Sequence, residues 1–554
     1  MSENLSLLSS RKGLEENLFE KLLIAAKEEG TPDSETLKNL AEAYLIGNAT
    51  TYGAASFYDF LKPQNKGKKV HTCNGTACLM ANSQEPLNKE LEKHFKAEEI
   101  GHICCLGRCH ENGAFKFQDK NYSGKTAQEI AQILAGKAPK NANLDFYSVG
   151  SNFQPAILTA PFSDIDTYYS VFEKALKTNA NELLSEIKKS NLRGRGGAGF
   201  PMGFKFEACK NEISDQKYIV CNADEGDPGA YSDRYLLEQQ PHSVLFGMMI
   251  AAYIIGANRG VLYIRAEYPE AIKIIAKAIK ELENKGLNGE NILGSGFDFR
   301  FKIIEGAGAY VCGEETALLS SIEGQRPEVR VRPPYPTQEG LFNKPTVVNN
   351  VETLAAIHNI LELGGEKFAT IGTKKSAGTK LVSLDSFFNT PGIYEIEMGT
   401  PLSEVLEKFG GGFTTKVKAL HIGGPLGGVV PVHKIKDLTL DFESFSENGF
   451  LLGHAGIVCI PESYPMIKYL EHLFEFTALE SCGKCFPCSI GSVRGQEMLS
   501  KAQKENDYKI DKTLMNDLLE TLEVGSLCAL GGGLPIGVKN TLQYFEDELN
   551  TYFS

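Results

Sequence analysis

Eight of the thirteen cysteines in this 554-residue sequence fall into two sets whose spacing suits metal ligation. The first set comes from two short segments, CNGTAC and CCLGRC, which supply Cys73 with Cys78 and Cys105 with Cys109. Thiolates paired on two loops suit a 2Fe-2S cluster, because each pair then binds one iron. A structural zinc ion is the competing interpretation, although zinc pairs usually have about two residues between the cysteines. By spacing alone Cys104 fits as well as Cys105, so the sequence leaves that ligand open.

The second set lies on one tight segment, ESCGKCFPC, with a fourth cysteine far downstream. Cys482, Cys485 and Cys488 follow the spacing C-x2-C-x2-C, and Cys528 comes much later in the chain. This arrangement is typical of a 4Fe-4S cluster, whereas zinc more often uses two separated pairs. The isolated cysteines, which we predict to be buried thiols, are Cys209, Cys221, Cys312 and Cys459.

A glycine-rich segment, RGRGGAGFPMGFK at residues 193–205, provides the second kind of chemistry. Glycine brings a ligand close to the backbone N–H groups, and a loop of such amides beside cations favours phosphate and dinucleotide. The segment fits G-x-G-x-x-G, but the Rossmann fingerprint must follow a strand, and residues 182–190 read as a helix. A simple turn is the competing interpretation. The glycines and cations of the segment are Arg193, Gly194, Arg195, Gly196, Gly197, Gly199, Gly203 and Lys205.

Two further segments carry carboxylates next to glycines. Residues 217–229 read as a short buried strand followed by the turn CNADEGDPG, at the strand end where α/β sheets place ligand contacts. A solvated acidic turn is the alternative for Asp224, Glu225 and Asp227. In GAGAYVCGEET, Glu314 and Glu315 either complement a helix dipole or meet a cofactor, and the sequence does not choose between these roles.

Composition limits the remaining possibilities. The net charge of −13 disfavours nucleic-acid binding. The apolar run at 244–257 is too short to cross a bilayer and is expected to form a buried helix, so we expect no membrane insertion. The N-terminus lacks the apolar core of a secretory signal, and the many cysteines favour metal or redox chemistry over disulfides. We therefore expect a cytoplasmic protein.

Element patterns predict a multidomain fold, α/β followed by α. We expect a helical lead-in and 2Fe-2S domain at 1–140, a Rossmann-like α/β domain at 141–372, a β-grasp (ubiquitin-like) module at 373–432 and a helical 4Fe-4S domain at 433–554. The individual elements that we expect are helices at 14–29, 34–45, 241–257, 269–285 and 401–409, and strands at 69–73, 260–265 and from 217.

Taken together, these motifs resemble the NADH-binding flavoprotein subunit of respiratory complex I and its soluble relatives. The matching segments are GRGGAGFPMGFK, CNADEGDPG, GAGAYVCGEETALL, VVNNVETL, ESCGKCFPC and SLCALGG, in family order over about residues 150–550. The first 140 residues resemble the thioredoxin-like 2Fe-2S subunit of the same complex, fused in front. Such a fusion is similar to the diaphorase subunits of NAD-reducing hydrogenases and NAD-dependent formate dehydrogenases.

The resemblance implies that FMN is bound by the loop from Gly194 to Lys205, with further contacts from Asn222, Asp224, Glu225, Asn349 and Asn350. Phe200 and Tyr335 match aromatic residues that stack on the adenine of NADH, and Glu315 matches a carboxylate near the nicotinamide. We expect Tyr310, Gly313 and Glu314 to line the same cofactor site. Asp227 stands where many complex I members have Glu, Arg332 where lysine is common, and Ala208 where some members carry a third aromatic residue. These departures favour the soluble diaphorases.

The implied chemistry is electron transfer between NAD(H) and one-electron carriers, with FMN between them. We expect partner subunits that carry iron–sulfur clusters and a hydrogenase active site. A formate dehydrogenase or a respiratory NADH dehydrogenase is the alternative, and a non-catalytic relay scaffold is an interpretation of a different class. The intact glycine loop and Lys205 argue against the scaffold.

Overall fold

Four parallel strands in the order β8-β7-β6-β9 form the sheet, here called the parallel sheet, around which the largest core is built. The computed structural model describes residues 13–15 and 17–554. Alternate residues of these strands point to opposite faces, so that Ile219 and Cys221 pack into one core and Val220 into another. The strands are β6 Tyr218–Ala223, β7 Arg259–Ile264, β8 Arg300–Glu305 and β9 Thr346–Asn350.

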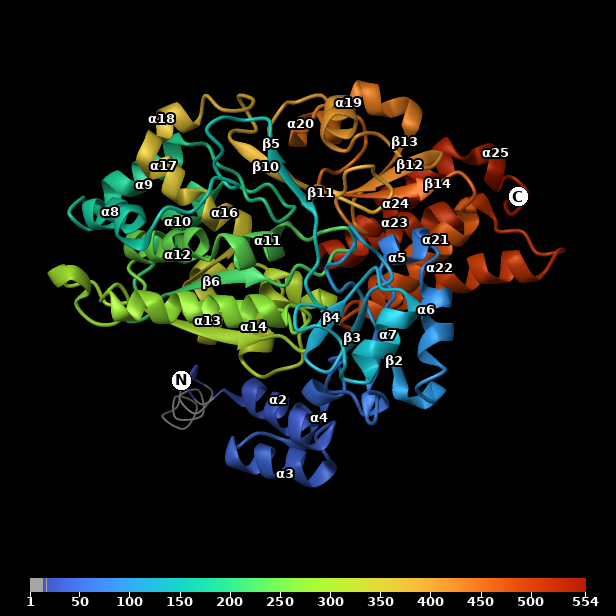
Figure 1. Cartoon of the computed structure of the whole chain (residues 1–554), viewed down its shortest axis with the longest axis horizontal. Helices are drawn as coiled ribbons and strands as arrows, with labels where there is room; N and C mark the ends of the chain where they lie inside the picture. The colour runs from blue at the N-terminus through green and yellow to red at the C-terminus, as the bar shows by residue number, and fades with distance from the viewer. Residues whose placement is uncertain (1–12, 16) are drawn as a thin grey trace.

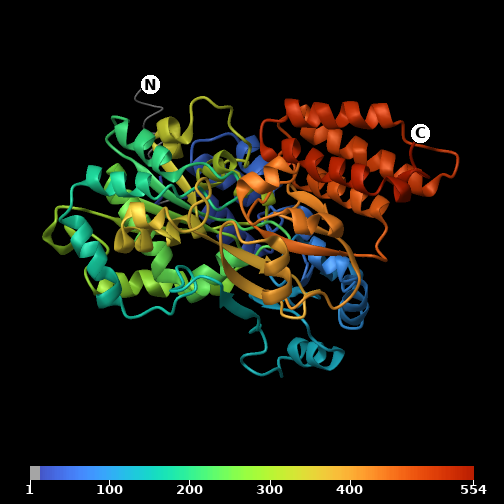
Figure 2. The same cartoon turned by 90° about the horizontal axis from the view of Figure 1, so that it is seen from above.

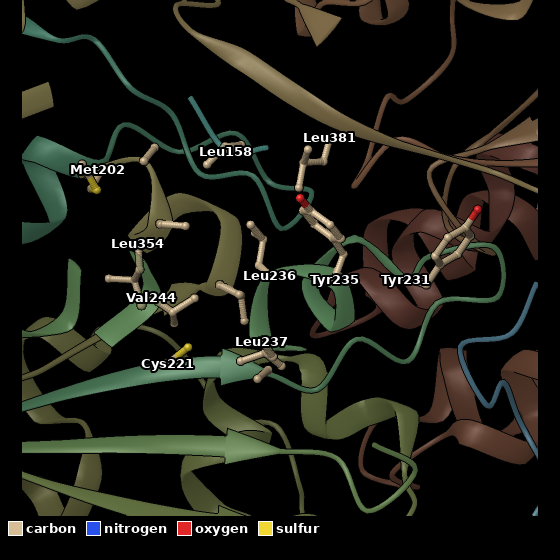
Figure 3. Packing of buried hydrophobic residues seen from close by; sticks show 14 of the residues in the cluster. Leu158, Met202, Cys221, Tyr231, Tyr235, Leu236, Leu237, Val244, Leu354 and Leu381 are labelled. Atoms are coloured by element: carbon tan, nitrogen blue, oxygen red, sulfur yellow. The ribbon is translucent and has the colours of Figure 1, made fainter. Parts of the chain in front are cut away.

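One face of the parallel sheet is covered by the apolar helix that the sequence predicted. Helix α12, Pro241–Ile255, is almost wholly buried, and Leu237 and Val244 pack beside Cys221 of β6 in Figure 3. The neighbouring helices are α8 Ile165–Leu176, α9 Ala180–Lys189, α10 Met202–Asn211, α11 Ser232–Gln239, α13 Pro269–Asn284, α16 Val351–Ala355, α17 Ile357–Leu363 and α18 Gly365–Phe368.

The opposite face of the parallel sheet is covered by helices from the start of the chain. Leu18, Phe19 and Leu22 of α2 pack against Val220 and Ile304 of the sheet. Figure 1 shows α2, α3 and α4 below the strands. The lead-in helices therefore complete the core of the parallel sheet, an arrangement that the sequence did not indicate. They are α2 Leu18–Glu29, α3 Ser34–Ala43 and α4 Asn48–Ala55, joined on this face by α14 Glu315–Ile322.

A small sheet with the order β2-β1-β3-β4 carries the first cysteine set. Strands β1 and β2 are parallel, whereas β3 is antiparallel to both β1 and β4. Its elements are β1 Val70–Cys73, α5 Thr76–Met80, α6 Gln84–Leu91, β2 Ile100–Ile103, β3 Phe115–Phe117, β4 Lys120–Tyr122 and α7 Ala127–Leu134.

A six-stranded mixed sheet has the order β13-β12-β14-β10-β11-β5. Strands β5 and β14 come from outside residues 373–432, so the sheet extends beyond the module expected there. The β-grasp assignment and the domain boundaries stay predictions. The strands are β5 Ser148–Ser151, β10 Thr379–Leu384, β11 Gly392–Glu397, β12 Val417–Ile422, β13 Gly428–Pro431 and β14 Gly456–Pro461, and the expected helix at 401–409 is α19 Leu402–Glu404 with a π-helical turn at Val405–Phe409.

The C-terminal region is a helical bundle, drawn in red in Figures 1 and 2. It consists of α21 Met466–Glu480, α22 Phe486–Lys504, α23 Lys512–Gly525, α24 Ala529–Tyr544 and α25 Glu546–Leu549, preceded by α20 Phe442–Glu447. Among the described residues, no helix has both the length and the apolar character needed to cross a membrane.

Candidate functional site

The glycine-rich loop follows a helix, α9, and closes on itself before α10 begins. The amide of Gly194 donates to the carbonyl of Phe200 at 2.8 Å, and Arg193 forms an isolated antiparallel β-bridge with Pro201. Gly199 has φ +60°, a conformation that L side chains rarely adopt. At Gly196 a Cβ would lie 2.9 Å from the Cβ of Asn350, so the loop must pass directly over the end of β9. This confirms that the segment is not a strand-to-helix Rossmann turn.

Both arginines of the loop contact segments outside it, and Nε of Arg193 also donates to the loop carbonyl of Gly199 at 2.6 Å. Arg195 is 1% exposed, and its guanidinium donates to the carbonyl of Ala377 just before β10. Arg193 lies 4.4 Å over the ring of Phe442 and forms an ion pair with Glu443 at 2.5 Å. The two side chains therefore fasten the loop to the region of the six-stranded sheet. The sequence predicted them as cations for a bound anion and missed this anchoring role.

Lys205 is the cation that stays beside the carboxyl ends of the parallel strands. Its Nζ lies 3.1 Å from Oε2 of Glu315 and donates to the carbonyl of Val348 at 2.9 Å. Arg332 approaches the other oxygen of Glu315 at 3.0 Å. Glu315 is therefore held between two cations at the first residue of α14.

The neighbouring Glu314 has a different role. Its Oε2 accepts from the amides of Thr316 and Ala317, each at 2.9 Å, and so caps α14. The helix-capping interpretation therefore holds for Glu314, and the cofactor contact of Glu315 stays a prediction. Glu314 caps the helix and its Oε1 lies 3.8 Å from Arg332, whereas Glu315 pairs with both Lys205 and Arg332.

Three atoms of the predicted flavin contacts and the glycine loop are buried and have no partner among the described residues. They are Oδ2 of Asp224, Nδ2 of Asn349 and Nη1 of Arg195. Burial raises the pKa of Asp224 well above its usual range. Asn222 donates to the carbonyl of Gly313 at 2.8 Å, which brings the ends of β6 and the segment before α14 together. An unpartnered acceptor and donor near bare glycine amides fit a flat polar cofactor such as a flavin, because unsatisfied buried groups are costly.

Glu225 and Asn350 already have partners. Both oxygens of Glu225 accept from the first turn of α11, and Oε2 also accepts from Tyr268 at 3.0 Å. Asn350 caps α16 and donates to Asp233 at 2.6 Å. These side chains shape the site through the backbone that they hold in place.

Asp227 is fixed by two side chains. Tyr310 donates to its Oδ1 at 2.6 Å, and Nε2 of His454 lies 3.1 Å from Oδ2. The amide of Gly456 donates to Nδ1 of the same histidine. Nothing near His454 in the sequence signals this contact, because the two residues come from different sheets.

The two predicted stacking residues expose their rings. Phe200 and Tyr335 are each 54% exposed, and Tyr335 precedes α15 (Pro336–Glu339), which packs against α10. Exposed rings next to a glycine loop are available to stack on a planar ligand.

The cysteines of the first set are buried, and two of their sulfurs lie close together. Cys73, Cys78, Cys105 and Cys109 are 0–3% exposed, and the sulfurs of Cys105 and Cys109 lie 3.6 Å apart. The amide of Gly229, from the loop after β6, donates to the sulfur of Cys109 at 3.3 Å. The neighbouring thiol of Cys105 and burial raise the pKa of Cys109 well above its usual range.

Cys104 faces elsewhere. It lines a cavity of about 10 Å³ together with Asp59, Tyr310 and Glu480. Cys105 is therefore the residue of the two that faces Cys109.

The second set lies at one end of the helical bundle. Cys482, Cys485, Cys488 and Cys528 belong to one apolar cluster, in which Cys485 and Cys528 are partly exposed. Burial raises the pKa of Cys488 to about 11 and that of Cys528 to about 12, so binding a metal there would release thiol protons. Within the described part of the chain, no three His, Cys, Asp or Glu side chains are grouped to hold a single metal ion.

Three family models match separate parts of the chain. Residues 6–138 match a thioredoxin-like [2Fe-2S] ferredoxin, residues 187–359 a Nuo51 FMN-binding domain, and residues 468–552 the iron–sulfur binding region of NADH-ubiquinone oxidoreductase-F.

Similar curated proteins include subunits of hydrogenases and of NADH dehydrogenases. The NADP-reducing hydrogenase subunit HndC of Solidesulfovibrio fructosivorans is 44% identical over 69% of this chain and 78% of its own length. The NAD-reducing hydrogenase HoxS subunit alpha of Cupriavidus necator is 34% identical over 89% of this chain and 85% of its own. A crystal structure of NAD+-reducing [NiFe]-hydrogenase in the H2-reduced state matches 96% of this chain and 92% of its own, with a TM-score of 0.84 and 26% identity.

Proposed function

The chain belongs to the family of NADH-binding FMN and iron–sulfur subunits, and we propose that it is the diaphorase subunit of a soluble NAD-reducing hydrogenase. It is an NAD(H)-dependent oxidoreductase subunit with FMN, 2Fe-2S and 4Fe-4S domains. One observation carries the hydrogenase assignment. The HoxS alpha subunit, from an NAD-reducing hydrogenase, is similar over 89% of this chain, whereas HndC and a NADH-quinone oxidoreductase subunit of Rhizobium meliloti each match 69% of it.

The proposed flavin contacts follow from the free atoms of the site. We assign the phosphate to the amides of the glycine loop, and the ring to Asp224 and Asn349, whose buried atoms lack partners among the described residues. Lys205 and Arg332 hold Glu315 in one orientation, and Glu315 would position the nicotinamide. A bound FMN supplies the conversion between hydride transfer and one-electron transfer. Phe200 and Tyr335 would stack on the adenine and orient the dinucleotide.

The proposed cluster ligands are the two cysteine sets. Cys105 is preferred to Cys104, because its sulfur lies 3.6 Å from that of Cys109. Two sulfurs also accept from amides, Cys73 from Gly75 and Cys105 from Gly107, both at 3.4 Å, and such bonds support a charged thiolate. The partly exposed second set would exchange electrons with an iron–sulfur partner subunit. Free thiols throughout the described chain suit a reducing compartment, and we place the assembly in the cytoplasm.

A formate dehydrogenase or respiratory assembly is the second candidate. To separate the candidates, the complex formed by the tagged full chain is isolated anaerobically from its host and assayed with NAD+ and either H2 or formate. We expect NADH to form with H2 only. Formation of NADH with formate only would reject the hydrogenase assignment.

The role of Glu315 is tested in the same complex. We expect Glu315→Gln to lower kcat/KM for NADH by about tenfold, which is about 1.4 kcal/mol, with FMN content unchanged. Glu290→Gln is the control, since Glu290 is exposed and pairs with Arg300 at 2.9 Å, away from the glycine loop. Unaltered kinetics in Glu315→Gln would remove Glu315 from the site.

A further inference from the structure

Two arginines of the parallel-sheet region reach across to the loop that carries Cys105 and Cys109. Nη2 of Arg265, which follows β7, donates to the carbonyl of Cys105 at 2.8 Å and to that of Cys104 at 3.1 Å. Arg234 of α11 donates to the carbonyl of Gly107 at 2.9 Å. Both arginines are 2–3% exposed, so their charges lie in the protein interior.

The charge of Arg265 is balanced by the side chain of Glu267. This carboxylate accepts from Nη2 of Arg265 at 2.7 Å, and its other oxygen, Oε2, has no partner among the described residues. Glu267 is itself 3% exposed. The cation thus donates directly to the loop, whereas the carboxylate binds the cation.

The second cysteine set has a weaker counterpart of this contact. Arg326 donates to the carbonyl of Cys482 at 3.3 Å, but its side chain is 36% exposed. Water and salt screen an exposed charge, whereas a buried charge acts through a lower effective dielectric. The buried Arg265 should therefore act more strongly on a nearby redox centre than the partly exposed Arg326.

We propose that Arg265 and Glu267 are positioning residues that set the reduction potential of the 2Fe-2S centre, Arg265 raising it and Glu267 lowering it. This inference rests on the proposed function, in which Cys105 and Cys109 hold that centre. A 2Fe-2S cluster held by these cysteines would gain one negative charge on accepting one electron, with no bond formed or broken. A buried cation on the ligand loop stabilises the added charge, and a buried anion opposes it.

The test is a redox titration of the full chain with dithionite and mediators. The electron paramagnetic resonance signal of the 2Fe-2S centre monitors the titration. We expect Arg265→Gln to lower the ratio of reduced to oxidised centre about tenfold at a fixed poise, which is about 59 mV for one electron. Glu267→Gln should raise the ratio, and the double variant should lie between the two single variants. Arg265→Lys keeps the charge and should stay near the wild type.

A purely structural role predicts a different result, in which both single variants shift in the same direction or lose iron together. Either result would overturn the inference. If Arg265→Gln fails to fold, Glu267→Gln is the remaining test, and no shift in that variant would also overturn the inference. Arg259→Gln is the matched control, because Arg259 begins the same strand at the end remote from Arg265 and approaches Glu15 at 3.8 Å. A wild-type chain without any 2Fe-2S signal would instead overturn the cluster assignment in the proposed function.

Discussion

The two cysteine sets lie in opposite kinds of environment. The first set is 0–3% exposed, and its segments form hydrogen bonds with the parallel-sheet region, the residues after β10 and the helical bundle. The second set occupies the end of the bundle, where two of its four cysteines are partly exposed. Burial on all sides suits a centre that exchanges electrons only within the chain, whereas partial exposure suits one that passes them to a partner.

Exposed apolar side chains flank the second set. Phe486 is 76% and Val524 81% exposed, and Pro487 lies against Gly525, which joins the two segments. Ile490 follows Phe486 by one turn of α22. Clustered exposed apolar residues mark an interaction site. We infer that the iron–sulfur partner subunit binds here, because these residues flank the cysteines that would exchange electrons with it.

The largest expected effect separates the two sets. Cys485→Ser should remove the 4Fe-4S centre and lower the iron content from about six to about two per chain. FMN should stay bound, because none of the cysteines of the second set is among the proposed flavin contacts, and transfer to the partner should stop. Iron and flavin analysis of the anaerobically purified chain measures this outcome, and retention of about six irons would contradict the ligand assignment.

The next effect concerns the partner surface. Phe486→Asp should weaken partner binding about 30-fold, or about 2 kcal/mol, because a charged group replaces an exposed apolar anchor. NADH-dependent reduction of an artificial acceptor should not change. Ile213→Asp is the control, since Ile213 is fully exposed but lies after α10. Equal binding by both variants would exclude this surface.

A smaller effect is expected from chelation. A ferrous chelator should remove iron from the second set about tenfold faster than from the first, because access to the buried set requires local opening of the structure. The two clusters are followed by their separate electron paramagnetic resonance signals. Equal rates would show that burial of the first set does not protect it.

Local patterns in the sequence were sufficient to predict many elements. The apolar run became α12, and the alternation of strands and helices became β6 to α13. The carboxylate turn after β6 also lies where expected, because a short buried strand followed by glycine and aspartate is a local signal. Cysteine spacing is also a local signal, and the two ligand sets that it indicates stay predictions.

The contacts that organise the site were not predictable in this way. Arg195 contacts Ala377, Asp227 contacts His454, and the first helices cover the parallel sheet. Each contact joins segments that are remote in the chain, and the local sequence around one partner does not predict the other. The loop arginines illustrate this limit. A cation in a glycine-rich loop predicts binding of an anionic ligand, but these two arginines instead anchor the loop to other segments of the chain.

The smallest expected effect tests how the buried set is tied to the bundle. Thr76 begins α5, which carries Cys78, and its hydroxyl lies 3.0 Å from Nε2 of His472 in α21. Thr76→Val keeps the shape but removes this bond, at a cost of about 1 kcal/mol. Amide exchange in α5 should then rise about fivefold.

Hydrogen–deuterium exchange measured by mass spectrometry gives the comparison, with residues 482–488 as the internal reference. That segment should not change, because it lies apart from the bond between Thr76 and His472. Thr370→Val is the control, since its hydroxyl donates to the carbonyl of Lys367 three residues before, at 2.7 Å. An even rise over both cysteine sets would mean that the bundle and the first set open as one unit, and an unchanged α5 would mean that the other contacts to the loop hold it without His472.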